Sequence, residues 1–473
     1  MIKFKVPVVI IWLDCLARDV FVNMYRNGDL QNLSNYFADG VFVENVITCF
    51  PTVSESAEGG IISGYFSGET NMIGERYFSR KSKTIKHYKY NAEARQDFNP
   101  KLINKTIDAI IGESIGMGRI IHTANENIED LKALQYERKG SLKIVKRRIE
   151  IASRIILSRK PRLFFFTVSA DYISHVYGRN SAEVKEFIKE FDKNFLFLAE
   201  NLDEAYGKDN YLIFIFSDHG SANVSRHLDL TAILAENGFN PATTDLLTER
   251  KYVNCAALSN GRRMGLLYFA HPEYGWSKKI SYKQLRSYPH KGEKVDLLKM
   301  FASLDGVEQA FAKRDSKSVM VVSRDGEGLI QYDSINKKYK YTVLEGSDPL
   351  GYEMEPAWMS EEEWLRATFC SEYPDAVVQL YNMFKSKNCG DIVLNAASGW
   401  DFWEPWDISY PVLKASHGGL SKDEMATFLL AKAPFMKKAT LEYARLIDIF
   451  ATIAAYYNAG DLVANSHAVE RIF

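Results

Sequence analysis

Cysteine is scarce in this sequence: there are five in 473 residues, widely spaced and without a CxxC pair. This usage argues against a disulfide framework and a thiolate zinc site, and it favours free thiols in a reducing compartment. Long apolar runs are also missing, since no stretch approaches the roughly 20 apolar residues of a membrane-spanning helix. We therefore expect a cytoplasmic protein without a transmembrane segment.

An excess of charge of either sign is absent too. Lys and Arg number 59 against 60 Asp and Glu, a net charge of -1, so no specific nucleic-acid binding is expected. One segment, residues 138–162, is strongly basic and has isoleucines at helical spacing. Such a helix can lie on a membrane or a polyanion, but an ordinary surface helix with a solvated charged face is the favoured interpretation.

Short apolar runs alternate with longer segments of helical spacing, which predicts an α/β fold with a largely parallel sheet. The predicted strands are Val8–Leu13, Gly118–His122, Leu163–Val168, Tyr211–Phe216 and Ile392–Leu394. The predicted helices are Lys101–Glu113, Val145–Leu157, Ala182–Ala205, Pro374–Phe384 and Thr440–Tyr457.

Residues 243–352 break this alternation with short β-like pieces separated by turn residues. We interpret them as an inserted α+β subdomain. The catalytic core would then comprise residues 1–242 and 353–473.

Acidic and histidine side chains occur at or near strand ends in this core. Ligand-binding residues of open α/β sheets lie at the carboxyl ends of strands. A lone Asp in such a place is usually a turn or cap residue, so the prediction depends on all of them converging. Six oxygen and nitrogen ligands on one rim would suit zinc, manganese or iron. The six are Asp14, Asp171, His175, Asp218, His219 and His417.

A hydroxyl-bearing residue is predicted at the start of a helix in CFPTVSESAEGGIISG. Ser54 or Thr52 could simply cap a helix that begins near Glu55. The same position also places a hydroxyl beside free backbone N–H groups, which phosphate oxygens favour. A metal ion there would lower the pKa of the hydroxyl and make it a nucleophile.

Five separated motifs resemble the alkaline phosphatase superfamily and, within it, the type I phosphodiesterase/nucleotide pyrophosphatase branch. They are IIWLDCLARD, FPTVSESAEGGIISGYFSGETNMIGERYF, SADYISHVYG, FSDHGSANVSRHLDL and ASHGGLSKDEM, in the family's order. The resemblance extends over nearly the entire chain. It implies an alkaline phosphatase-like three-layer sandwich.

The resemblance also implies a role for each candidate residue. One divalent ion would be bound by Asp14, Asp218, His219 and the nucleophile, and the other by Asp171, His175 and His417. Ser54 occupies the place of the nucleophile, where the branch more often carries Thr, and Thr52 is the fallback. Zinc is the favoured metal, with manganese or iron as alternatives.

The chain departs from the family in TNMIGERYF, where an Asn that contacts phosphate is usual. Glu75 stands in that place, and Thr70 and Asn71 stand where His-Gly is common. A carboxylate repels phosphate unless it is protonated, paired or turned away. Arg76 could bind phosphate instead, which would favour a monoester, or Glu75 could hold a cation or a cationic substrate group. Trp403 could stack a base or sugar, although packing of its loop is the simpler interpretation.

The resemblance therefore implies a phosphodiesterase or nucleotide pyrophosphatase that forms a covalent phospho-serine and acts on a small phosphate ester, possibly a nucleotide. A phosphomonoesterase on the same scaffold is the first alternative. A binding protein without activity is the remote one, because all six metal ligands are present.

Overall fold

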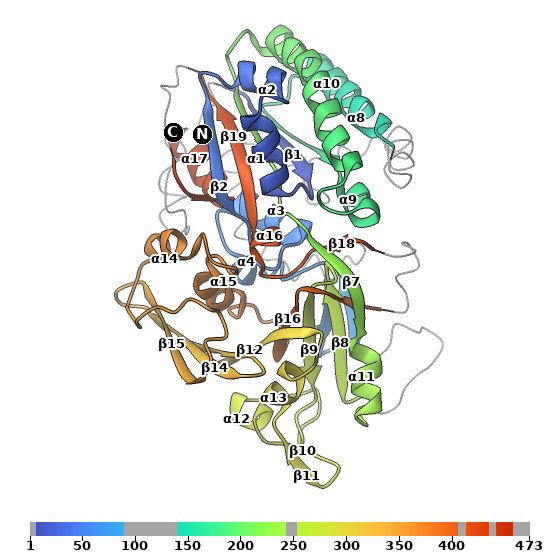
Figure 1. The fold of residues 1–473 in the computed structure, drawn as a ribbon, viewed down its shortest axis with the longest axis vertical. Coiled ribbons are helices and arrows are strands. Elements are labelled where there is room, and N and C mark those ends of the chain that lie inside the picture. Colours follow the sequence, from blue (N-terminus) through green and yellow to red (C-terminus); the bar gives the residue numbers. More distant parts are fainter. Residues whose placement is uncertain (1–5, 89–140, 243–252, 405–412, 435–440, 457–473) are drawn as a thin grey trace.

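The computed structural model describes residues 6–88, 141–242, 253–404, 413–434 and 441–456. The predicted helix at Lys101–Glu113 and the predicted strand at Gly118–His122 lie outside these residues. Figure 1 shows two sheet regions, with the N-terminal strands in one and the middle of the chain in the other.

The first region is built on a six-stranded sheet in the order β20-β2-β19-β6-β1-β5. Strand β1 is parallel to both β5 and β6, β2 is parallel to β20, and β19 is antiparallel to its neighbours β2 and β6. All strands except β19 therefore run in one direction, which confirms the predicted mostly parallel sheet. The strands are β1 Val8–Asp14, β2 Val41–Ile47, β5 Leu163–Ser169, β6 Leu212–Phe216, β19 Ala426–Lys432 and β20 Ala444–Arg445.

Strands β1 and β6 are apolar at successive positions and are buried along their length, apart from the half-buried Asp14. Such continuous burial requires cover on both faces of the sheet, as the predicted three-layer arrangement provides. The helices of this region are α1 Arg18–Arg26, α2 Gln31–Tyr36, α3 Ser54–Ser63, α4 Ser67–Thr70, α8 Lys143–Arg159, α9 Asp171–Tyr177, α10 Ala182–Tyr206, α16 Lys422–Met425 and α17 Asp448–Tyr456.

The basic segment forms helix α8, which packs on α10 and β5. Its apolar stripe, including Ile144, Val145, Ile149 and Ile156, is buried in the core beneath the sheet. This is the packing expected of an ordinary surface helix. No helix in the described parts of the chain is long and apolar enough to cross a membrane.

The second region is an antiparallel seven-stranded sheet in the order β15-β14-β13-β12-β16-β9-β8. The predicted strand near Ile392 belongs to this sheet, between β12 and β9, so its placement among the parallel strands was wrong. The strands are β8 Cys255–Asn260, β9 Met264–Phe269, β12 Val307–Asp315, β13 Ser318–Val322, β14 Gly326–Asp333, β15 Lys338–Gly346 and β16 Ile392–Ala396. The helices of the segments around it are α11 Leu230–Glu236, α12 Tyr282–Leu285, α13 Leu297–Ala302, α14 Glu361–Thr368 and α15 Ala376–Met383.

Three small sheets complete the described structure. One has the order β17-β7-β18. Its strand β7 follows β6 in the sequence and runs from the first region toward the second (Figure 1). The others are the pairs β3–β4 and β10–β11. Their strands are β3 Arg76–Ser79, β4 Thr84–His87, β7 Ala222–Asp229, β10 Tyr288–His290, β11 Glu293–Val295, β17 Gly399–Trp403 and β18 Ala415–Ser416.

The second sheet extends along the chain past the predicted insert, and one helix begins later than expected. The second sheet takes in β16, which lies beyond the predicted end of the insert at residue 352. The predicted helix Thr440–Tyr457 begins only at Asp448, because Ala444–Arg445 pairs with β2 as the edge strand β20.

Candidate active site

Three of the predicted ligands gather where β1 and β6 end. Asp14 is the last residue of β1, and Asp218 and His219 follow β6 by two and three residues. One ligand atom from each residue lies within 4.8 Å of the others. The register explains this, because Trp12 lies opposite Phe216 and the two parallel strands therefore end at the same edge of the sheet. We call Asp14, Asp218 and His219 the first ligand set.

Neighbouring backbone and hydroxyl groups orient the carboxylates of this set. The Ser169 hydroxyl, at the end of β5, donates to Asp14 Oδ2 over 2.8 Å. Cys15 has a left-handed backbone conformation, with φ of 60°, and its N–H donates to Asp218 Oδ1 over 3.1 Å. Asp218 and His219 are fully buried, so little freedom remains for either side chain.

Ser54 faces the first ligand set from the start of α3. Its hydroxyl donates to Asp218 Oδ2 over 3.0 Å. Ser54 is the first residue of the helix, and the N-cap position belongs to Val53, which makes no side-chain capping bond. The structure therefore does not show the simple capping role for Ser54. A helix that starts without a cap leaves N–H groups available to another acceptor.

The other three predicted ligands form the second ligand set, namely Asp171, His175 and His417. Asp171 and His175 lie four residues apart on one face of α9, and His417 follows β18. His175 Nε2 is 3.0 Å from Asp171 Oδ1, and His417 Nε2 is 3.5 Å from the same oxygen. Their ligand atoms also lie within 4.8 Å of one another.

All three histidines are held in the same way. Nδ1 of His175, His219 and His417 contacts the backbone carbonyl of Ala415, Gly220 and Thr52 at 2.7, 3.0 and 2.8 Å, respectively. A carbonyl only accepts, so each Nδ1 carries the proton and each Nε2 of a neutral ring presents its lone pair to the carboxylates. This is the arrangement found for metal-binding histidines.

Two electron-pair donors that face each other at 3.0 to 3.5 Å require a proton or a cation between them. Burial alone would lower the pKa of His417, but its bond with Asp171 outweighs burial and raises that pKa. Burial would raise the pKa of Asp171, but the two histidines outweigh it and lower that pKa. In His219 burial prevails over Asp218 and lowers the pKa.

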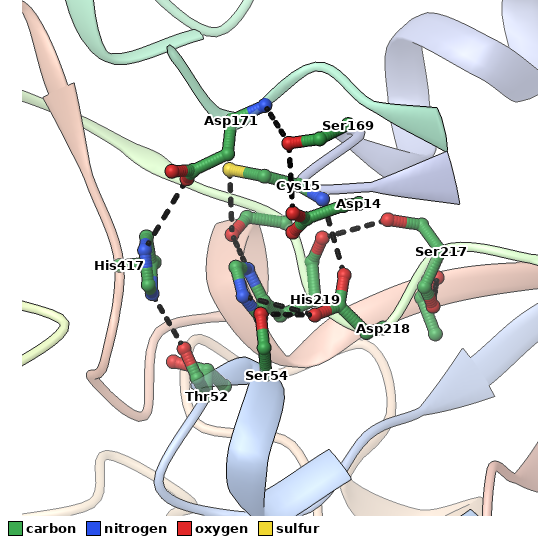
Figure 2. A network of polar contacts seen from close by, with 12 residues as sticks. Asp14, Cys15, Thr52, Ser54, Ser169, Asp171, Ser217, Asp218, His219 and His417 are labelled. Carbon is green, nitrogen blue, oxygen red and sulfur yellow. Dashed lines mark hydrogen bonds and ion pairs between the residues drawn. The ribbon is translucent and has the colours of Figure 1, made fainter. Parts of the chain in front are cut away.

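The donor chemistry therefore fits a divalent metal ion in each set. His219 Nε2 is buried, makes no hydrogen bond and lies 3.2 Å from Asp218 Oδ2. Oxygen and imidazole nitrogen in each set suit zinc, manganese or iron. The two sets are neighbours, because the His219 and His417 rings stack with centroids 4.1 Å apart. Figure 2 shows Ser54 beside His219 of the first set.

Thr52, the fallback nucleophile, is fully buried and both of its oxygens are engaged. Its hydroxyl donates to Gly419 O over 2.9 Å and accepts from Gly418 N over 2.8 Å. This hydroxyl holds the loop after His417, whereas the hydroxyl of Ser54 faces the first ligand set.

The predicted substrate-binding residues lie around the two sets to differing degrees. The charge of Glu75 is close enough to contribute to the raised pKa of His417. Arg76 is buried and paired: its guanidinium lies 2.7 Å from Glu404 and donates to Ser259 O. The side-chain oxygen of Asn71 accepts from the Ser386 hydroxyl, which belongs to neither set.

Trp403, at the end of β17, is 38% exposed. The stacking of Trp403 on a base or sugar of the substrate stays a prediction.

Several positioning residues were not predicted. Ser169 lies two residues before Asp171, and Cys15 directly follows Asp14, so proximity to a strand end was the available signal. Glu424 accepts from the Gly419 N–H over 2.6 Å and pairs with Arg263 Nε at 3.0 Å. Nothing in the sequence indicates that contact, because Arg263 and Glu424 are far apart along the chain.

The chain also matches a known protein family over most of its length. The model for type I phosphodiesterases and nucleotide pyrophosphatases matches residues 8–134 and 123–419. The chain belongs to this family. The family and the proteins that the chain resembles are phosphoester hydrolases.

Curated relatives match over short stretches. Alkaline phosphatase PafA of Elizabethkingia meningoseptica is 42% identical over 62 residues, which is 12% of this chain and 11% of that protein. Alkaline phosphatase PhoV of Synechococcus elongatus is 39% identical over 56 residues, 12% of this chain and 10% of that protein. The match thus spans about a tenth of the length of these relatives.

Solved structures show that the whole fold is shared. The murine ectonucleotide pyrophosphatase/phosphodiesterase 5, in an inactive form bound to AMP, superposes with a TM-score of 0.54 and 14% identity. The match covers 96% of this chain and 95% of the murine one. The human protein gives a TM-score of 0.53 with the same identity and coverage. At this identity the likeness shows the fold alone, and it confirms the predicted alkaline phosphatase-like architecture.

Proposed function

We propose that this protein is a metal-dependent phosphodiesterase or nucleotide pyrophosphatase that uses Ser54 as its nucleophile. One observation carries the proposal: the Ser54 hydroxyl is hydrogen-bonded to Asp218, at an uncapped helix start, where two carboxylate–histidine sets meet. A structural serine would not need two metal-binding sets around it.

The residues of the chain would perform the reaction in two displacements. In the first, Ser54 Oγ forms a bond to phosphorus while the bond to the leaving oxygen breaks, which gives a phospho-serine. In the second, water attacks phosphorus and the bond to Ser54 Oγ breaks, which restores the hydroxyl. Backbone N–H groups at the start of α3, where no side chain caps the helix, would bind the non-bridging phosphate oxygens.

Asp14, Asp218 and His219 would hold one metal ion, and Asp171, His175 and His417 the other. Bound there, divalent ions would lower the pKa of the attacking hydroxyl and neutralise charge on the phosphate and the leaving oxygen. Zinc suits these ligands best, with manganese or iron as alternatives. The described cysteines are all free. Free thiols support a reducing compartment, and we place the protein in the cytoplasm.

The substrate would be a small phosphodiester, possibly a nucleotide. The complex of the murine relative with AMP supports this class. Phosphomonoester hydrolysis is the second candidate, because two relatives are alkaline phosphatases. That candidate would gain from an arginine free to bind a dianion, whereas Arg76 is paired with Glu404. We therefore favour the diester.

Replacement of the nucleophile tests the proposal. Ser54→Ala should abolish turnover of bis-p-nitrophenyl phosphate and leave both metal ions bound, as measured by elemental analysis of the purified protein. Ser56→Ala is the matched control, because this buried serine on the same helix donates to Met72 O and not to a ligand. Full activity of Ser54→Ala would refute the proposal.

A second assay separates the two candidates. Rates on bis-p-nitrophenyl phosphate and p-nitrophenyl phosphate, with added Zn²⁺ or Mn²⁺, should favour the diester. A faster monoester reaction would establish the phosphatase instead. A folded protein inert on both substrates with every metal would support the remote alternative of a non-catalytic binding protein.

A further inference from the structure

The segment before the nucleophile is bonded directly to the loop that carries the last metal ligand. Thr52, two residues before Ser54, contacts three successive residues of the His417 loop. Its carbonyl accepts from His417 Nδ1 at 2.8 Å, and its hydroxyl accepts from Gly418 N at 2.8 Å and donates to Gly419 O at 2.9 Å. Figure 2 shows Thr52 below the His417 ring.

These bonds leave the ligand loop little freedom on this side. The carbonyl of Thr52 fixes the tautomer of His417, so that Nε2 faces Asp171. The hydroxyl clamps the two glycines that follow. Gly418 has a φ of 110°, and a Cβ there would lie 2.2 Å from Asn260 O, so the loop can take this path only with glycine.

The opposite side of the loop is held by the second region of the molecule. Arg263 directly precedes β9, the second strand of the β8–β9 hairpin. Its backbone N–H donates to His417 O over 2.8 Å. Its side chain pairs with Glu424, which accepts from Gly419 N. Arg263 therefore fixes the loop relative to the second sheet. Of Arg263, Glu424 and Thr52, only Thr52 lies on the segment that carries the nucleophile.

We propose that Thr52 is a positioning residue of the second metal site, because its bonds set where His417 stands relative to Ser54. The inference rests on the proposed function. Without the Thr52 hydroxyl, Gly418 N and Gly419 O each lose a partner, and the loop can shift relative to α3. The second metal ion should then bind more weakly, whereas the first set, which has no bond to Thr52, should keep its affinity.

Zinc binding to the full-length Thr52→Val variant tests this positioning role. Competition with a chromophoric chelator should show second-site affinity reduced by about 10- to 100-fold, the range typical of outer-shell partners, and first-site affinity unchanged. The kcat on bis-p-nitrophenyl phosphate should fall with it and recover at high zinc. Thr52→Ser keeps the hydroxyl and should restore both values. Thr52→Ala provides the same loss if valine does not fold.

Thr368 offers a matched control. Its buried hydroxyl also donates to a carbonyl, Trp364 O at 2.7 Å, and accepts a backbone N–H, that of Asp375 at 2.8 Å. Thr368→Val should lose a similar amount of stability and leave zinc affinity at both sites unchanged. Equal effects of the two variants on zinc binding, or no effect of Thr52→Val, would overturn the positioning role of Thr52.

The proposed function fails separately. Its failure would appear as a wild-type protein that binds no metal or as full activity in Ser54→Ala.

Discussion

The two ligand sets of the proposed metal centre differ in what holds them in place. The first set is carried by two adjacent parallel strands, and Asp218 and His219 are fully buried. The second set combines a seven-residue helix with a loop that comes from a distant part of the chain. Asp171 in the second set also keeps 26% of its side chain exposed.

This difference has a physical consequence. Asp14 ends one strand of the central sheet, and Asp218 and His219 closely follow the neighbouring strand, so the geometry of the first set comes with the sheet. The second set depends on side-chain bonds from Thr52 and Glu424 to a glycine-containing loop. We therefore expect the first site to bind metal more tightly and the second to respond more to changes outside the ligands.

The largest effect is expected from Asp218→Asn. This change removes a metal ligand and the acceptor of the Ser54 hydroxyl together. Turnover should fall by well over the roughly 100-fold that loss of an outer-shell partner can cost. Steady-state kinetics and elemental analysis would check this, with loss of the first ion expected. Retention of two ions and near-normal kcat would contradict the assignment of the first site.

Replacement of a second-set ligand should separate the two sites. His175→Ala should leave one tightly bound ion per chain, because His175 contacts Asp171 of its own set and the Ala415 carbonyl two residues before His417. Activity should be strongly reduced but partly restored by excess zinc. Isothermal titration calorimetry would count the ions. Loss of both ions would show that the sites are not independent, and the comparison above would then fail.

The strand-end ligands were predictable because their signal is local. An apolar run that ends in Asp identifies both the strand and the residue at its end, and the observed ends of β1 and β6 place Asp14 and Asp218 together. The direction of a strand relative to its neighbours could not be predicted in the same way. The run near Ile392 is buried on all sides in an antiparallel sheet, and an apolar run alone cannot distinguish this from a parallel strand.

Long-range partners could not be read from the sequence. Arg76 looked free to bind phosphate, but its partner Glu404 is more than three hundred residues away along the chain. Ser54 was expected near an N-cap, and the one-residue difference that makes Val53 the cap is within the usual uncertainty of helix ends. Both differences concern contacts and boundaries, and neither concerns the type of an element.

Glu424→Gln should have an intermediate effect. The glutamate is fully buried and pairs with Arg263, so its neutralisation leaves the arginine charge uncompensated. Loss of one partner of a buried pair costs roughly 3–5 kcal/mol, and glutamine should recover part of this because it can still accept from Gly419. Urea denaturation would measure the loss. If the second region supports the ligand loop, second-site zinc affinity should fall too, with the first site unchanged.

The smallest effect, on pH dependence, tests whether the second region has electrostatic stability of its own. Hydrogen bonding to Arg286 outweighs burial and lowers the pKa of Glu327. A lowered carboxyl pKa means that the pair stabilises the fold above the unfolded-state pKa of about 4.3, and that this contribution is lost as the pH falls through the lower folded-state value.

Glu327→Gln should therefore cost about 1 kcal/mol or less near pH 7 and nothing well below pH 4, where the wild-type carboxyl is protonated as well. Denaturation of both proteins across this pH range would show the two stabilities converge in acid. At pH 7 the first-site zinc affinity of Glu327→Gln should equal that of the wild type. Glu327 lies in the second sheet, whereas the first set lies at the strand ends of the central sheet. A parallel shift of the two curves at all pH values would mean that the charge of Glu327 is not what stabilises this region.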